Sequence, residues 1–398
     1  MSAAEQHVFV SGDEAVAMGV RLARPDVISA YPITPQTVVV ERLSEYVEDG
    51  SLHCQFMHVE SEHSAMSAAM GVSATGARAF TATSSQGLLH MCEGLHYASG
   101  SRFPIVMMNA NRATAAPWNI YGDQRDSLSM LDCGWIQVYV EDAQEACDMM
   151  IQGYRVAEDP AVLTPFMINL DGFVLTHTYE LVSLPSQEEV DEFLPPLETE
   201  NKMDPLSPKS LCITIGPGLD QEIKYQQHQA MMQAEEVIER VDREFGDRFG
   251  RYYGGMLEAY QCEDAEFILV ATGTTVGTAR TVVDALRSEG VSAGVLKLRY
   301  LRPFPVKQLG EYARKANVIG VLDRDISFGM EGTIFTNVNS ALSRCGSALE
   351  TMNFIGGLGG RDISKQDLTD IFQKMQDQAT GKKQPHVQFF GMECETNE

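Results

Sequence analysis

Glu62 is the first residue whose type and position indicate chemistry. It lies where VESEHSAMSAAMG (59–71) changes from an expected strand into a helix of small residues. The helix dipole alone favours a carboxylate in a first helical turn, so a structural role stays open. The alternative role is to hold a heteroaromatic ring nitrogen in its protonated form. His58, Glu60 and His63 lie close in sequence, but a strand–helix junction points such side chains in different directions, so we expect no metal site.

Arg112 and Thr34 are candidates for binding a substrate. Arg112 follows the apolar segment FPIVMMNAN (103–111). A guanidinium can bind a carboxylate through two hydrogen bonds, although an arginine at a strand end is often only a surface ion pair. Thr34 stands between Pro32 and Pro35, in a turn stiffened by proline. Its hydroxyl either bonds to the local backbone or reaches a ligand from a fixed position.

Three further segments are rich in polar residues or glycine. The loop PWNIYGDQRDS (117–127) either forms internal ion pairs in solvent or lines a site. The runs GTTVG (273–277) and GGLGG (356–360) match neither the dinucleotide-binding pattern nor the P-loop, so we interpret both as packing turns.

The elements that must position these residues alternate between strands and helices from about residue 8 to 182. This pattern predicts an α/β fold with a parallel sheet covered by helices on both faces. Ligands bind such sheets at the carboxyl ends of the strands. The segments expected there are Tyr31 to Thr37, Glu60 to Ser64, Thr83 to Gln86, Asn111 to Asp126, and Asp171 onward.

The remaining chain predicts a second α/β unit. Residues 183–250 read as a Pro-rich acidic connector and a long polar helix (about 222–246), which would brace the units or contact another subunit. We predict a first unit of residues 1–250, a second of 262–376, and a polar tail, 377–398. In the second unit, VSAGVLKLRYLRPFP (291–305) should form a strand followed by a Pro-rich turn.

Composition excludes several classes of partner. The net charge of −25 and pI near 4.7 argue against nucleic acid and anionic membranes. The first residues, MSAAEQHVFVSGDE, have no leader pattern, and no apolar stretch is long enough to cross a bilayer, so we expect a cytoplasmic protein. None of the eight cysteines forms a C-x-x-C pair, which argues against an iron–sulfur or zinc site: Cys54, Cys92, Cys133, Cys147, Cys212, Cys262, Cys345 and Cys394.

Six segments in order resemble the α chain of the 2-oxoacid:ferredoxin oxidoreductases, most closely the pyruvate type. The resemblance spans nearly the whole chain, and Y-P-I-T-P with E-S-E-H-S-A-M is its most specific part. The segments are GDEAVAMGVRLARPDVISAYPITPQT, HVESEHSAMSAAMGVSATGARAFTATSSQGL, NRATAAPWNIYGDQRDS, LDGFVLTHT, LKLRYLRPFP and GLGGRDI.

The resemblance implies a pyrimidine-binding domain of the thiamine diphosphate fold, followed by a domain like the C-terminal domain of transketolases. It implies conversion of pyruvate, coenzyme A and oxidised ferredoxin into acetyl-CoA, carbon dioxide and reduced ferredoxin, a reversible reaction. Glu62 would contact the aminopyrimidine ring, and Thr34 and Arg112 the substrate. The other implied site residues are Tyr31, Pro32, Ser85 and Gln86 for the cofactor, and Asn111, Asp123 and Asp126 in the substrate loop.

One missing motif bears on the partners. Thiamine enzymes hold Mg²⁺ and the diphosphate with G-D-G, but GDE (12–14), GDQ (122–124) and GDR (246–248) all lack the third glycine. The resemblance therefore implies that a β subunit carries Mg²⁺ and the diphosphate site. It also implies iron–sulfur clusters on partner subunits, γ and δ subunits, ferredoxin docking on a partner, and a dimer of hetero-oligomers.

Several alternatives stay open. Gln124 stands where the family often has His after Gly-Asp, so the exact 2-oxoacid is not fixed, and a branched-chain substrate is the first alternative. A subunit of a non-redox thiamine enzyme is the second. A non-catalytic assembly subunit is the third.

Overall fold

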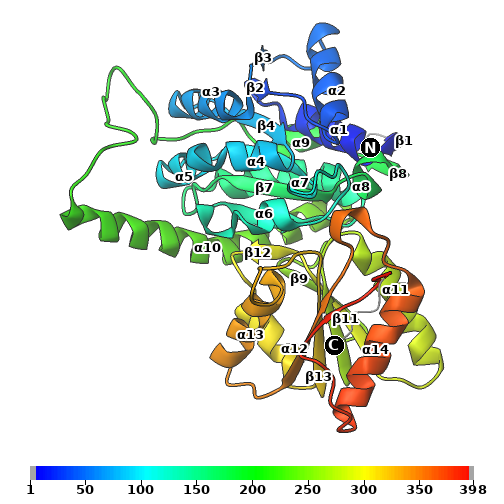
Figure 1. The fold of residues 1–398 in the computed structure, drawn as a ribbon. Coiled ribbons are helices and arrows are strands. Elements are labelled where there is room, and N and C mark those ends of the chain that lie inside the picture. Colours follow the sequence, from blue (N-terminus) through cyan, green and yellow to red (C-terminus); the bar gives the residue numbers. More distant parts are fainter. Residues whose placement is uncertain (1–5, 394–398) are drawn as a thin grey trace.

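A seven-stranded sheet forms the centre of the N-terminal half in the computed structural model, which describes residues 6–393 (Figure 1). Its strands are parallel except for β12, which is antiparallel at one edge, and this confirms the predicted parallel sheet. Cys394 lies outside the described residues. Across the sheet the order is β12 (Tyr300–Arg302), β6 (Ile136–Tyr139), β7 (Phe166–Asp171), β5 (Val106–Asn111), β4 (Ala79–Thr83), β2 (Val27–Ala30) and β3 (Gln55–His58).

Helices cover both faces of this sheet because its strands carry apolar side chains on alternating sides. Met108 and Ile168 belong to one core, whereas their neighbours Met107 and Met167 belong to another. The first core is closed by α1 (Gly12–Ala23), α2 (Thr37–Glu48) and α7 (Ala143–Ala157), and the second by α3 (Glu62–Ala74), α4 (Gln86–His90) and α5 (Cys92–Gly100).

A two-stranded ribbon, short helices and one long helix complete this half. The long helix, α10, starts with Pro217 at its first position and ends before Gly250, whose φ of +72° suits a left-handed cap. It is longer at both ends than the sequence predicted. The elements are β1 (Gln6–Ser11) paired with β8 (Tyr179–Leu184), α6 (Arg125–Leu128), the 3-10 helix η1 (Leu131–Cys133), α8 (Val174–His177), α9 (Gln187–Phe193) and α10 (Pro217–Phe249).

The second unit is a six-stranded sheet, also covered on both faces. Its order is β15 (Val387–Phe389), β14 (Glu350–Ile355), β13 (Val318–Asp323), β10 (Phe267–Ala271), β11 (Ala293–Leu298) and β9 (Leu257–Tyr260), of which only β9 is antiparallel. Helices α11 (Thr275–Ser288) and α14 (Lys365–Ala379) close one core, α12 (Val306–Ala313) and α13 (Thr333–Arg344) the other, and η2 (Leu358–Gly360) follows β14.

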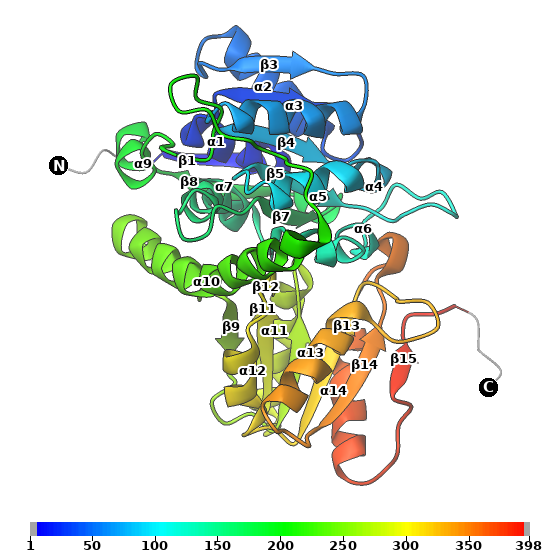
Figure 2. The ribbon, with the colours of Figure 1, turned by 90° about the vertical axis from the view of Figure 1, so that its left-hand side faces the viewer.

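The two units are interlocked rather than joined by a simple linker. The segment predicted as one strand before a Pro-rich turn forms two strands, β11 and β12, and β12 pairs with β6 and so extends the sheet of the first unit. Helix α10 lies between the units (Figure 2) and acts as a brace, because it packs on α7 and its Glu235 and Glu239 accept hydrogen bonds from Gln308 of α12.

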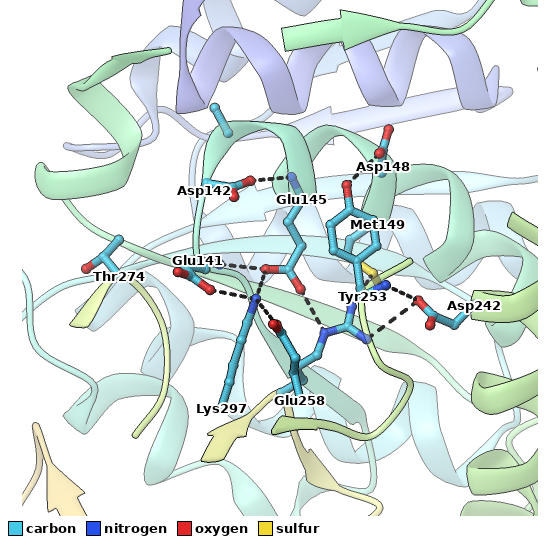
Figure 3. A network of polar contacts seen from close by, with 12 residues as sticks. Glu141, Asp142, Glu145, Asp148, Met149, Asp242, Tyr253, Glu258, Thr274 and Lys297 are labelled. Carbon is cyan, nitrogen blue, oxygen red and sulfur yellow. Dashed lines mark hydrogen bonds and ion pairs between the residues drawn. The ribbon is translucent and has the colours of Figure 1, made fainter. Parts of the chain in front are cut away.

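A buried network of charges sits at this junction (Figure 3). Glu145 of α7 is fully buried and binds Lys297 Nζ at 2.8 Å and Arg299 Nε at 2.8 Å. Lys297 also pairs with Glu141 at 2.9 Å. Burial acts to raise the pKa of Glu145, but the two cations dominate and lower it to about 2.

The predicted boundaries can now be compared with the elements. The second sheet already includes β9, which begins at Leu257, and the predicted tail contains the end of α14 and strand β15. Within residues 6–393, no helix combines the length and apolar character needed to span a membrane.

Candidate active site

The predicted site residues gather at the carboxyl edge of the seven-stranded sheet. Strands β2, β4, β5 and β7 are parallel neighbours in that sheet, so their last residues share one edge. The segments that follow β2, β4 and β5 carry Thr34, Ser85 and Arg112. Helix α3, which begins with Glu62, follows β3 at the same edge.

Glu62 is held at the start of α3 with little freedom. Ser61 caps the helix by accepting a hydrogen bond from the Ser64 amide at 3.2 Å. The Glu62 side chain is 8% exposed, and its Oε2 lies 3.3 Å from His90 Nδ1. Glu62 Oε1 has no hydrogen-bond partner among residues 6–393, which leaves one carboxylate oxygen available to a ligand.

The turn after β4 packs closely against that carboxylate. A Cβ atom at Gly87 would lie 2.7 Å from Glu62 Oε1 and 2.5 Å from Thr83 Oγ1, so a larger residue would not fit there. Thr83 Oγ1 is buried and has no hydrogen-bond partner in the described chain. Ser85 adopts a φ of +52°, a strained conformation for a residue other than glycine, and such strain is frequent at functional sites.

Arg112 is a buried guanidinium without an acidic partner. It is 3% exposed, and none of the ion pairs of the described residues includes it. Its Nη1 donates to the Thr34 carbonyl at 2.8 Å, and its guanidinium lies 5.5 Å from the Trp118 ring centre. Burial lowers the pKa of Arg112. A buried guanidinium without an acidic partner favours binding of a carboxylate, because the ion pair would offset the free-energy cost of removing the cation from water.

Asp126 connects the ends of β4 and β5. This fully buried carboxylate accepts hydrogen bonds from the amides of Ser85 at 3.0 Å and Arg112 at 3.1 Å, and from Asn111 Nδ2 at 2.8 Å. Burial raises the pKa of Asp126 to about 6, so it is mainly ionised at neutral pH. Its effect is to fix the two loops that carry Ser85 and Arg112.

The other predicted residues are more peripheral. Tyr31 and Pro32 are exposed, and the Thr34 side chain is exposed as well. Gln86 Oε1 accepts from the Ser85 hydroxyl at 2.6 Å. Asp123 is turned toward the second unit, where it accepts from the Gly359 amide at 2.9 Å.

Two residues whose contacts the sequence analysis did not predict join the site to the second unit. Asp171, at the end of β7, pairs with Arg324 at 2.5 Å and accepts from Thr274 Oγ1 at 2.6 Å. Gln124, buried, accepts from Thr272 Oγ1 at 3.1 Å. Only the position of Asp171 at a strand end could have indicated it, since its partners lie more than 100 residues away.

One cavity of the described chain lies away from this edge. This cavity, of about 640 Å³, is lined by residues around Arg78 and Asp191, below the connector. In the range 6–393, no three His, Cys, Asp or Glu side chains are grouped to hold a metal ion. The geometry therefore offers an open surface with one carboxylate and one guanidinium.

Two family models match the chain. The model described as "Pyruvate flavodoxin/ferredoxin oxidoreductase, thiamine diP-bdg" matches residues 18–243. The model described as "Pyruvate:ferredoxin oxidoreductase core domain II" matches residues 265–368. The chain belongs to the pyruvate:ferredoxin oxidoreductase family. Membership confirms the family predicted from the sequence motifs.

Relatives within this oxidoreductase family match over most of their length. Pyruvate synthase subunit PorA of Methanothermobacter thermautotrophicus is 48% identical, over 92% of this chain and 94% of the relative. PorA of Methanocaldococcus jannaschii is 47% identical, over 93% and 96%. Ketoisovalerate oxidoreductase subunit VorA of Pyrococcus horikoshii is 46% identical, over 92% and 93%.

A solved structure shares the fold. It is the 2-oxoglutarate:ferredoxin oxidoreductase from Magnetococcus marinus with 2-oxoglutarate, coenzyme A and succinyl-CoA bound. The TM-score is 0.74 at 18% identity, and the match covers 93% of this chain but 65% of that one. This structural similarity supports the α/β fold of the chain.

Proposed function

We propose that this chain is the α subunit of a pyruvate:ferredoxin oxidoreductase. The complex oxidatively decarboxylates pyruvate with coenzyme A to acetyl-CoA and carbon dioxide, and reduces ferredoxin, in a reversible reaction. The observation that carries this proposal is the 43–48% identity to subunits named pyruvate synthase PorA over nearly the whole chain. Ketoisovalerate is the second candidate substrate, because VorA subunits are 45–46% identical over the same length.

The residues around Glu62 fit the aminopyrimidine ring of thiamine diphosphate. Glu62 Oε1 accepts no hydrogen bond within the described chain, the Thr83 hydroxyl is buried without a partner there, and Gly87 lets the backbone approach both closely. Bound there, thiamine diphosphate would supply the carbon nucleophile and the electron sink that decarboxylation of a 2-oxoacid requires. Glu62 would hold the proton on the ring nitrogen, which a neutral glutamine could not stabilise equally.

Arg112 would bind the carboxylate of the 2-oxoacid. Its guanidinium is buried and free of acidic partners in the described chain, and Thr34 lies beside it, with the Thr34 carbonyl on Nη1 and the hydroxyl on the exposed side. A fixed guanidinium orients the keto carbon as well as binding the charge. The other predicted residues would line the site around the cofactor and substrate: Tyr31, Pro32, Ser85, Gln86, Asn111, Asp123 and Asp126.

Partners would complete the open site. We assign Mg²⁺ and the diphosphate group to a β subunit, because no G-D-G motif occurs in this sequence. We assign the iron–sulfur clusters to partner subunits, with γ and δ subunits in a dimer of hetero-oligomers, and ferredoxin to a partner's surface. We expect the assembly to work in the cytoplasm.

Kinetics of Arg112 variants in the assembled complex test the substrate site. A charged hydrogen-bonded contact contributes about 1.5–3 kcal/mol, so Arg112→Ala should lower kcat/KM for pyruvate roughly 10- to 100-fold. Arg112→Lys, which keeps the charge but loses the planar fork, should fall between Ala and the parent. The KM for ferredoxin should stay unchanged.

Arg344→Ala, at an exposed position on α13, is the matched control. Parental kcat/KM for pyruvate in Arg112→Ala would remove Arg112 from the site. A higher kcat/KM for ketoisovalerate than for pyruvate in the parent complex would assign the chain to the second candidate function.

A further inference from the structure

The glycine-rich loop of the second unit touches the loop that carries the substrate residues. The substrate loop (111–126) begins at the last residue of β5 and meets η2. Asn119 Nδ2 donates to the Gly359 carbonyl at 2.9 Å, and the Gly359 amide donates to Asp123 Oδ2 at 2.9 Å. One residue of the second unit therefore contacts the substrate loop at two points.

The contact requires glycine. Gly359 has a φ of +60°, and a Cβ atom there would lie 2.5 Å from Asn119 Nδ2. Gly360 has a φ of +81°, and its Cβ would lie 2.3 Å from Tyr121 Cβ. Both the backbone conformation and the close approach exclude larger residues. The run GGLGG is thus a packing turn, as predicted, but one that packs on the site.

Asn119 transmits this contact to Arg112. Its carbonyl accepts from Arg112 Nε at 3.4 Å, and its Oδ1 accepts from the Tyr121 amide at 2.8 Å. The Asn119 side-chain amide is therefore hydrogen-bonded at both atoms: Nδ2 bonds to the second unit, and Oδ1 bonds to the first. The adjacent Trp118 lies over the guanidinium.

We propose that Asn119 and Gly359 form a clamp between the units that positions the Arg112 guanidinium for the substrate carboxylate. Asn119 is a positioning residue, since it reaches the substrate only through Arg112. The inference rests on the proposed function, because Arg112 is the carboxylate ligand there. It predicts that substrate binding depends on contacts made by the second unit, about 240 residues further along the chain.

Two single variants test the clamp in the assembled complex. Asn119→Ala removes both side-chain bonds, and Gly359→Ala forces the two loops apart. Each should raise the KM for pyruvate, and the Kd for oxamate measured by calorimetry, by about five- to tenfold, the effect of about one misplaced hydrogen bond. The kcat at saturating pyruvate and the KM for ferredoxin should change less than twofold.

Gly346→Ala is the matched control for Gly359→Ala. Gly346 also lies in the second unit with a positive φ, +69°, but a Cβ there would meet nothing within 4 Å. It carries the same backbone strain without the contact. Equal oxamate Kd values for Gly346→Ala and Gly359→Ala, or parental values for Asn119→Ala, would overturn the clamp.

Double variants separate the clamp from the proposed function. If the clamp acts through Arg112, adding Asn119→Ala to Arg112→Ala should not weaken oxamate binding further, and Asn119→Ala with Gly359→Ala should be less than additive. Additive losses would contradict the clamp while leaving Arg112 as the ligand. Unaffected oxamate binding in Arg112→Ala would instead contradict the proposed role of Arg112 as the carboxylate ligand.

Discussion

Asp126 shows how much one buried side chain can organise. Its two oxygens accept hydrogen bonds from segments that follow different strands, so the carboxylate substitutes for a direct link between them. The donors are the amides of Ser85, Arg112 and Ser127 and the side chains of Asn109 and Asn111. Buried hydrogen bonds of this kind favour one arrangement of the loops, although Asn109 Oδ1 and Asn111 Oδ1 have no hydrogen-bond partner within the described chain.

Asp126→Asn should destabilise the protein and displace both loops. The new NH₂ group would face N–H donors, leaving buried groups unpaired, and we expect a loss of about 2–4 kcal/mol in the free energy of unfolding. Denaturant unfolding measures it. Asp220→Asn, at an exposed position on α10, should be neutral, and an equally small loss at Asp126 would show that its hydrogen bonds are dispensable.

Glu62→Gln should slow activation of the cofactor. If Glu62 holds the ring nitrogen proton, hydrogen–deuterium exchange at the thiazolium carbon should slow by two or more orders of magnitude in the assembled enzyme. Glu60→Gln is the control, because Glu60 is exposed two residues away and bonds only to Ser64. Exchange at the parental rate in Glu62→Gln would reduce Glu62 to a carboxylate that stabilises a helix end.

Individual site residues could be predicted from the sequence where they follow the end of an expected strand. Glu62 and Arg112 follow apolar segments, so their place at the sheet edge could be derived from the pattern alone. Thr83 was also placed at a strand end, but its unpaired hydroxyl was not predicted, and neither was the contact of Asn119 with the second unit. Their roles depend on what they meet, and the Gly359 partner of Asn119 is 240 residues away, beyond any local pattern.

Helix α7 and strand β11 owe their fixed relation to buried charges, and this makes the junction sensitive to acid. Because the folded pKa of Glu145, about 2, lies below the ordinary 4.5, its ion pairs stabilise the fold above pH 4.5. That contribution, about 3 kcal/mol, is lost as the pH falls from 4.5 toward 2.

Glu145→Gln should therefore flatten the pH dependence. The variant will be less stable at neutral pH, since Lys297 and Arg299 remain buried without their carboxylate. Between pH 4.5 and 2 its free energy of unfolding should fall about 3 kcal/mol less than the parent's. Glu222→Gln, exposed on α10, should keep the parental slope. Parallel curves for Glu145→Gln and the parent would contradict this account.

Elements with strong periodicity were predicted well, and a short one was missed. The alternation of strands and helices sufficed to derive the parallel sheet, because it continues for many residues. Strand β12 is only Tyr300–Arg302, and the sequence pattern did not separate it from the strand before it. Whether such a segment pairs is decided by the open edge of β6, a feature of the assembled sheet.

On the scale of the whole molecule, charge predicts where ferredoxin does not bind. The chain has a net charge of −25, so a ferredoxin that is itself acidic should be repelled from most of its surface. Crosslinking such a ferredoxin to the assembled complex should label partner subunits chiefly. A main crosslink to this chain would contradict the expectation, and cationised ferredoxin serves as the control, since it should label this chain more.

The pairing of β12 with β6 also sets an order of events during synthesis. Strand β6 leaves the ribosome about 160 residues before β12, which at ~5–20 residues per second is roughly 8 to 30 s. During that interval the nascent first sheet presents an unpaired edge, the kind of surface that chaperones cover and that aggregation exploits. The first unit therefore completes its fold only after the ribosome has begun the second.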